Sequence, residues 1–169
     1  MKMRPFLRFL FVCCLLVANI AQSATQVTEV VIEDATLEAA IRQALELDAG
    51  DTLTDAHLVN LTALHLSPQS LSSLSGLEYA VNLQTLYLHL PYSVLANDGR
   101  LALSSLTPLS NLTKLRELYL PGCQIEDLNP LAGLSSLSYL YLSGNNISQI
   151  PNLSALTSLG SLSLDQNQI

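Results

Sequence analysis

The stretch LRELYLPGCQIEDLNPLAGLSSLSYLYLSGNNISQIPNLSALTSLGSLSL, residues 115–164, contains the pattern that decides the fold. Within it the hexad Leu-x-x-Leu-x-Leu begins at Leu115, Leu137 and Leu159, and this period of about 22 residues lies in the range of structural repeats. The same hexad begins further upstream at Leu61 and Leu83. A fixed period of this kind predicts one structural unit per repeat, with the units stacked into a solenoid.

Each hexad predicts a short strand whose leucines point into the coil while the intervening residues point outward. Apolar residues return 10, 13, 16 and 19 positions after the starts at Leu61, Leu115 and Leu137, as at Ile125, Leu128, Leu131 and Leu134, and at Ile147, Ile150, Leu153 and Leu156. The return path between hexads is rich in Asn, Ser, Thr and Pro, which predicts turns and short 3₁₀ pieces. The sequence therefore predicts an α/β solenoid with a parallel concave sheet of about five strands and a convex side of turns.

Two features modify the repeat. The hexads at Leu83 and Leu115 lie further apart than the others, so the extra residues between them form an insertion at 92–101. Eight positions after each start, a solenoid of this kind needs a side chain that satisfies backbone groups inside the turn. Asn145, Asn167 and Cys123 are predicted to fill this structural role, whereas Gln69 and Pro91 do not fit it.

The segment at 1–23 has the layout of a secretory signal peptide. Lys2, Arg4 and Arg8 precede an apolar run at 9–18, and Ala21-Gln22-Ser23 predicts cleavage after Ser23. The apolar run is shorter than a membrane span of about 18 to 20 residues. A bacterial lipoprotein site at Cys13 or Cys14 is the alternative, and it is disfavoured because bulky Phe11 and Val12 precede Cys13. The protein is thus expected to be secreted, extracellular or at the cell surface, with the periplasm as an alternative, and without a membrane span after cleavage.

Residues 24–57 are predicted to be a linker and a helical cap for the array. A first helix capped by Asp34 or Thr36 would place its apolar side chains on one face, namely Leu37, Ala40, Ile41, Ala44 and Leu45. A second short helix is predicted at 55–59 with Thr54 as its N-cap. The array itself is assigned to 58–169, and it ends part-way into the fifth repeat. We therefore expect either a longer array or self-association through an uncapped last repeat.

Composition excludes several classes of protein. Leucine accounts for 39 of the 169 residues, only 12% of residues are charged, and the formal net charge is −7. Once the predicted signal peptide is removed, four basic side chains remain against fourteen acidic ones, and Cys123 is the one cysteine left, so no intrachain disulfide is possible. Low charge with abundant leucine excludes a disordered polar chain. The acidic balance argues against a nucleic-acid partner, because no basic stripe exists.

The repeats at 115–137 and 137–159 resemble the bacterial leucine-rich repeats of the internalin type. The segment IEDATLEAAIRQALELDAGDTLTDAHLVNLTALHLS, residues 32–67, is similar to the helical cap that precedes such arrays. The resemblance covers roughly residues 30–169 and departs at Gln69, at Pro91 and at the insertion. It implies a secreted or surface binding module without catalysis, and it names no particular ligand.

The outward positions of the strands define the candidate binding face. Its central column is predicted to be His65, Tyr87, Tyr119, Tyr141 and Ser163, flanked by Ala63, Thr85, Glu117, Tyr139 and Ser161 on one side and by Ser67, His89, Pro121, Ser143 and Asp165 on the other. Tyrosine suits recognition because it offers a large amphipathic contact at low entropic cost. The alternative is that each tyrosine merely packs on its cross-strand neighbour. The predicted binding residues are His65, Tyr87, His89, Tyr119, Tyr139 and Tyr141.

The residues disfavour a metal site, a reactive cysteine and an enzyme active site. His65 and His89 would lie diagonally on adjacent strands, but no third metal ligand is evident, so neither a metal nor a cofactor is predicted. Cys123 is expected inside a turn, which favours a structural role over a reactive thiol. No G-x-S-x-G motif, Ser/His/Asp grouping or phosphate loop is present, so the chain is not predicted to be an enzyme.

The function predicted is therefore a non-catalytic module that binds a protein through the concave face. The alternatives are a targeting array at the N-terminus of a larger secreted enzyme and a structural spacer. Five strands offer a face of only about 300 to 400 Å², under half of the roughly 800 Å² that each partner buries in a standard interface. This stretch alone is thus expected to bind weakly, to use the insertion as well, or to be extended by further repeats.

Overall fold

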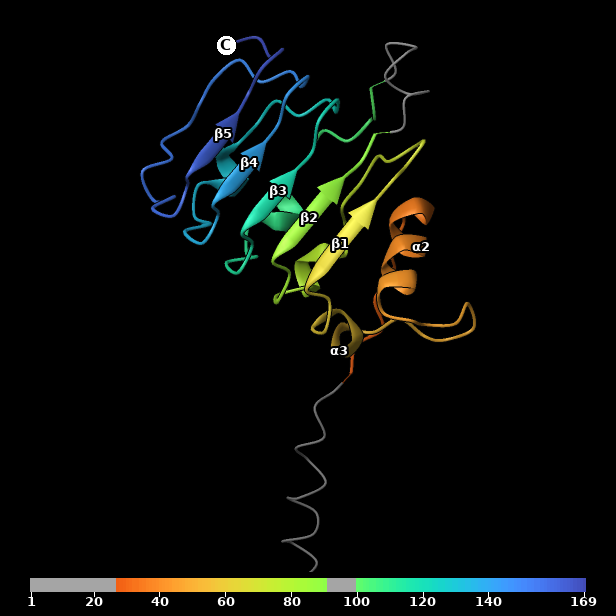
Figure 1. Cartoon of the computed structure of the whole chain (residues 1–169). Helices are drawn as coiled ribbons and strands as arrows, with labels where there is room; N and C mark the ends of the chain where they lie inside the picture. The colour runs from red at the N-terminus through yellow and green to blue at the C-terminus, as the bar shows by residue number, and fades with distance from the viewer. Residues whose placement is uncertain (1–26, 91–99) are drawn as a thin grey trace, which may run out of the picture.

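The computed structural model describes residues 27–90 and 100–169. The predicted signal peptide lies outside these residues, as does the insertion except for its last two positions. The described chain forms a solenoid in which each coil contributes one strand to a single sheet (Figure 1). The predicted α/β solenoid fold is confirmed.

Two helices precede the sheet, close to where the sequence places them. The first, α2, spans Ala35–Ala44, and the Asp34 carboxylate caps it by accepting hydrogen bonds from the amides of Thr36 and Leu37 at 3.0 and 3.1 Å. Leu37 and Ile41 are buried, because α2 lies against β1 at the edge of the sheet (Figure 1). Ala44, predicted to lie on the apolar face, is exposed, because its single methyl group does not reach the core against which the longer side chain of the next residue, Leu45, packs.

The second helix, α3, spans Asp55–Leu58, one residue shorter than predicted. Thr54 has the extended backbone of an N-cap, but its side chain makes no capping hydrogen bond. Its hydroxyl instead pairs with Nδ1 of His57 at 3.1 Å. The competition between a local ring nitrogen and a backbone amide for one hydroxyl explains why this cap lacks the bond that the sequence predicts.

Five strands form one parallel sheet in chain order. They are β1 Ala63–Leu66, β2 Thr85–Leu88, β3 Glu117–Tyr119, β4 Tyr139–Tyr141 and β5 Ser161–Ser163. The register pairs Leu64 with Leu86, Leu86 with Leu118, Leu118 with Leu140 and Leu140 with Leu162, so the hexads align as predicted. Because successive side chains of a strand point to opposite faces, this register also aligns every outward position.

The return path contains short 3₁₀ turns on the side of the coils away from the sheet. They are η2 Leu77–Tyr79, η3 Thr107–Leu109 and η4 Asn129–Leu131. A proline occupies the first helical turn of both η3 and η4, where its missing N–H costs no hydrogen bond. The turns and 3₁₀ pieces that composition predicts for this side are thus confirmed.

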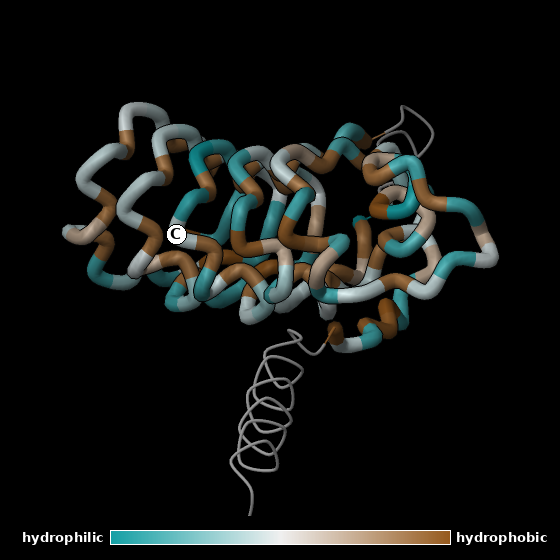
Figure 2. The backbone as a smooth tube through the Cα atoms, turned by 90° about the horizontal axis from the view of Figure 1, so that it is seen from below, coloured by the Kyte–Doolittle hydropathy of each residue, from teal (hydrophilic) through white to brown (hydrophobic). Residues whose placement is uncertain are grey.

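The core is a continuous column of leucines inside the coils. Hydrophobic residues recur at corresponding places in successive coils along the stack (Figure 2). The prediction of a buried side chain is wrong at two positions near the last coil, Ile150 and Leu162, which are 48% and 45% exposed. Both lie at the end of the described stack, where the described residues supply a neighbouring coil on one side only.

Candidate functional site

The strand register brings four aromatic side chains into one row on the exposed face of the sheet. His65 pairs with Tyr87, Tyr87 with Tyr119, and Tyr119 with Tyr141. Their ring centroids are 5.8, 4.4 and 5.2 Å apart in that order. Adjacent strands are about 4.8 Å apart, so rings at paired positions meet at stacking distance without bending the backbone. We call His65, Tyr87, Tyr119 and Tyr141 the aromatic row.

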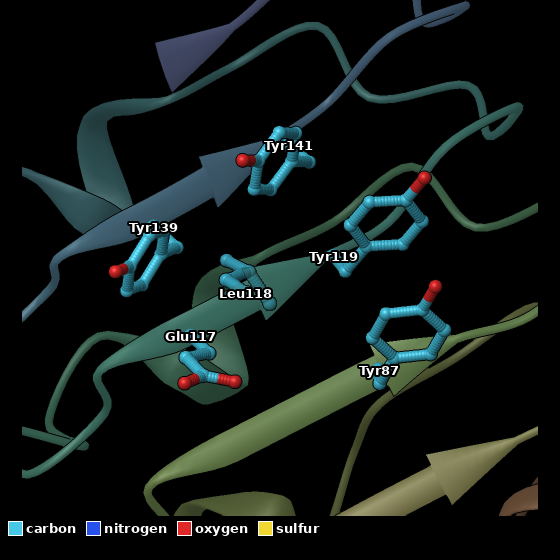
Figure 3. Close-up of a pocket in the computed structure, with 6 residues that line it drawn as sticks. All are labelled: Tyr87, Glu117, Leu118, Tyr119, Tyr139 and Tyr141. Atoms are coloured by element: carbon cyan, nitrogen blue, oxygen red, sulfur yellow. The ribbon is translucent and has the colours of Figure 1, made fainter. Parts of the chain in front are cut away.

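The aromatic row is not uniform. The rings of Tyr87 and Tyr119 are nearly parallel, at 6°, whereas Tyr119 and Tyr141 are tilted by 46°. The cause is a hydrogen bond of 3.0 Å between the Tyr141 hydroxyl and Oγ of Ser161 on β5. This bond turns the Tyr141 hydroxyl away from the direction in which the hydroxyls of Tyr87 and Tyr119 point (Figure 3).

The tilt of Tyr141 coincides with a hollow of about 230 Å³ on the face of the sheet. The hollow is lined by Tyr87, Glu117, Leu118, Tyr119, Tyr139 and Tyr141 (Figure 3). Its volume is below the roughly 300 to 1,000 Å³ of pockets that hold small molecules. The hollow therefore has the right size to hold one side chain of a partner protein.

Glu117 and Tyr139 form the other side of this hollow. They are paired across β3 and β4, in the column next to the aromatic row. Tyr139 is 49% exposed, the most exposed tyrosine on the sheet, and Glu117 is also exposed. Sequence reasoning placed Glu117 in this column without selecting it as a site residue. The signal that could have found it is its pairing with Tyr139, in the column directly beside a row of tyrosines on the same two strands.

Burial raises the pKa of the Tyr119 hydroxyl above its ordinary value, and the neighbouring Tyr87 and Tyr141 raise it further. The Tyr119 hydroxyl is therefore protonated at neutral pH. It can donate a hydrogen bond to a partner as well as accept one.

Comparison with known proteins agrees with this geometry. The family model described as leucine rich repeat matches residues 113–169. The structure of an internalin, InlF, from Listeria monocytogenes superposes with a TM-score of 0.70 and 33% sequence identity, over 85% of this chain and 40% of that one. The chain is a leucine-rich repeat protein of the internalin type.

A second structure shares the fold of this internalin-type chain. The functional domain of InlJ from Listeria monocytogenes superposes with a TM-score of 0.67 at 23% identity, over 79% of this chain. The chain spans 40% and 27% of the lengths of the two solved internalin chains. No curated protein matches the sequence. The internalin-like fold is consistent with a protein-binding module.

The internalin-type turns hold the predicted structural residues. Nδ2 of Asn145 donates to the carbonyls of Leu120 and Leu142, both at 2.9 Å, and Oδ1 accepts from the amide of Ile125 at 3.1 Å. Asn167 repeats this arrangement one coil later, donating to Leu142 and Leu164. Each asparagine thereby satisfies backbone groups of its own coil and of the preceding one.

Cys123 occupies the same position one coil earlier and is fully buried. Its thiol lies 3.5 Å from the carbonyl oxygen of Pro121, and burial raises its pKa to about 12. A thiol with this pKa holds almost no thiolate at neutral pH, so it is a poor nucleophile.

His89 is the one predicted binding residue that lies apart from the aromatic row and the hollow. It follows β2, where its amide donates to the carbonyl of Leu66 at 2.7 Å and its side chain is exposed. Within residues 27–90 and 100–169, no three His, Cys, Asp or Glu side chains cluster as metal ligands. Over the same residues, no helix has the length and apolar character to cross a membrane.

Proposed function

We propose that this chain is a secreted, non-catalytic module that binds a protein partner on the exposed face of its sheet. The observation that carries the proposal is the aromatic row with its adjoining hollow. Four aromatic rings and an exposed Tyr139 lie on one face, in a chain whose aromatic residues are only 5% of the total. Tyrosine-rich surfaces are typical of recognition sites, because the ring buries apolar area while the hydroxyl keeps a polar contact.

The stacking of the row also favours binding through preorganisation. A tyrosine held between two rings loses little side-chain entropy when a partner arrives, and this loss is about 0.5 to 1.5 kcal/mol for a free side chain at an interface. The Tyr141–Ser161 hydrogen bond fixes one ring further. The face thus presents rigid contacts before the partner binds.

Secretion and an extracellular or cell-surface location are part of the same proposal. Their support is the signal-like sequence of residues 1–23 and the likeness to internalin InlF. The exposed face of five strands is smaller than the standard interface area of about 800 Å² per partner. This small area supports a weak complex for this stretch of chain.

A panel of purified extracellular protein domains tests the binding proposal. We expect the chain to bind a subset of these domains, and Tyr119→Ala to weaken each complex at least about tenfold, because Tyr119 lies at the centre of the aromatic row. Tyr79→Ala is the matched control, since Tyr79 is 41% exposed but lies on η2 of the return path. Circular dichroism verifies that both variants fold.

Two results would contradict the proposal. One is a complex whose affinity is unchanged by Tyr119→Ala and by Tyr87→Ala while both variants remain folded. The other is a complex weakened equally by Tyr79→Ala, which would place the contact on the return path.

A further inference from the structure

Among the described residues, no ion pair involves the Glu117 carboxylate on the exposed face of the sheet. Its column neighbours are the neutral residues Thr85 and Tyr139. In residues 27–90 and 100–169 its side chain makes no hydrogen bond, and the ion pair found there joins Arg42 to Glu38, on α2. Lys114 and Arg116 precede β3 in the chain, and the Lys114 ammonium donates to the side chain of Asn82.

The whole outward face shares this negative bias. Its three columns contain neither lysine nor arginine, and their two acidic residues are Glu117 and Asp165. Asp165 already accepts a hydrogen bond from Oγ of Ser163 at 2.8 Å. Glu117 is therefore the carboxylate of this face that is free to pair with a group from outside.

The ring of Tyr139 provides the second half of a cation site. Tyr87 and Tyr119 stack on each other at 4.4 Å, so those ring faces are already occupied. Tyr139 has Glu117 and Ser161 as its column neighbours, neither of them aromatic. With 49% of its surface exposed, its ring is available to a partner, on the same side of the hollow as the Glu117 carboxylate (Figure 3).

We propose that the hollow binds an arginine side chain of the protein partner, with its guanidinium paired to Glu117 and packed on Tyr139. This inference rests on the proposed function and specifies the chemistry of its partner. A guanidinium can donate two hydrogen bonds to one carboxylate and stack on an aromatic ring at the same time. Cation–π contacts add to this attraction. The hollow of about 230 Å³ has room for one such side chain.

An apolar side chain fits the same space less well. It would remove the Glu117 carboxylate from water without supplying a partner, and a desolvated, unpaired charge is costly. An acidic side chain would face both Glu117 and a chain with a formal net charge of −7. Charge complementarity thus selects a cation.

The probe for this inference is N-acetyl-arginine methylamide, titrated into the full chain while tyrosine ring resonances are followed by NMR. The comparison is N-acetyl-citrulline methylamide, which has nearly the same shape without the charge. We expect saturable shifts at Tyr139 and Tyr119 with arginine in the millimolar range, and binding at least about fivefold weaker with citrulline. Equal binding of the two amides would overturn the proposal.

Paired variants locate the site. Glu117→Gln removes one charge from an exposed side chain without hydrogen bonds, and we expect it to weaken arginine binding about fivefold or more. Glu126→Gln is the matched control, because Glu126 is also exposed but lies on the return path, and it should leave the affinity unchanged. An unchanged affinity in Glu117→Gln, with the fold intact, would overturn the proposal.

The two proposals fail in different ways. A partner whose binding falls with Tyr119→Ala but not with Glu117→Gln would overturn the arginine site and leave the proposed function in place. A partner insensitive to Tyr119→Ala would instead contradict the proposed function.

Discussion

The two ends of the described array use the same hexad under different conditions. At the N-terminal end, β1 lies between α2 and β2, and its inward residues Leu64 and Leu66 are buried. At β5, the neighbour on one side is β4, and none of the described residues forms a coil on the other. There the equivalent Leu162 is 45% exposed, although its sequence context is the same.

A leucine in a repeat is therefore buried only where neighbouring coils pack on both sides of its own coil. One coil cannot enclose its own apolar face, so stability resides largely in the interfaces between neighbouring coils. The same substitution should therefore cost different amounts along the stack. Measuring those costs is a direct test of the comparison.

The largest effect is expected for Leu118→Ala in β3. Leu118 is fully buried between Leu86 and Leu140, so its truncation should lower the free energy of unfolding by about 3 kcal/mol through lost burial and a cavity. The matched change Leu162→Ala should cost about 1 kcal/mol or less, because half of that side chain is already in water. Urea unfolding followed by circular dichroism measures both.

Equal losses in the two variants would contradict the idea that neighbouring coils set the contribution of each leucine. Self-association through the fifth repeat is a separate question that the same samples can address. If Leu162 were covered by a second copy in solution, the cost of Leu162→Ala should rise with protein concentration.

Periodicity predicts most of this fold because so many positions obey one phase. The hexads establish the register of all five strands, and the outward columns follow from alternation along each strand. The aromatic row was predictable for the same reason. Asp34 was predictable as a cap, because a carboxylate just before an apolar helical pattern is a strong local signal.

The remaining features depend on contacts that the pattern does not encode. The tilt of Tyr141 results from the hydroxyl of Ser161, a neighbour in space that lies 20 residues away in the chain. The exposure of Ile150 and Leu162 depends on what packs beside the last coil and not on their own repeat position. The hollow arises from side-chain orientation, so Glu117 could be placed in its column but not recognised as part of a cavity.

The asparagines of the turns extend the comparison between an enclosed coil and the last described coil to polar side chains. Asn145 is buried and makes three hydrogen bonds to backbone groups, so Asn145→Ala should lower the free energy of unfolding by about 2 to 3 kcal/mol as those groups lose their partners. Asn167 makes the same kind of bonds but is half-buried, and water can replace them. We expect Asn167→Ala to lower the free energy of unfolding by about 1 kcal/mol, measured in the same urea experiment.

A loss for Asn167→Ala as large as that for Asn145→Ala would show that hydrogen-bond geometry outweighs burial in these turns. Asn145→Cys is a useful control, since Cys123 occupies the equivalent position one coil earlier. It should be less destabilising than Asn145→Ala if the thiol fills space that alanine leaves empty.

A smaller effect than those of Leu118→Ala and Asn145→Ala is expected at the N-terminal end, where Asp34 joins the helix to the array. Its carboxylate caps α2 and also accepts hydrogen bonds from the amide and the hydroxyl of Ser72, at 2.8 and 3.0 Å. Burial alone would raise the pKa of Asp34, but the hydrogen bonds from Ser72, Leu37 and Thr36 outweigh it and hold the pKa below its ordinary value of 3.8. Asp34→Ala should therefore lower the free energy of unfolding by about 1 kcal/mol at neutral pH.

The lowered pKa also determines how this contribution depends on pH. A carboxylate that is more acidic in the folded state stabilises the fold fully above its unfolded pKa, and this stabilisation is lost as the pH falls through the folded pKa. The difference in unfolding free energy between the wild type and Asp34→Ala should thus be constant from pH 7 to 5 and shrink below about pH 4. Asp34→Asn retains a capping side chain without the charge, so its deficit at pH 7 measures the charge alone. A deficit for Asp34→Ala that does not change with acidity would mean that the side chain stabilises this end by packing, and α2 would then cover the array through Leu37 and Ile41 without help from the carboxylate.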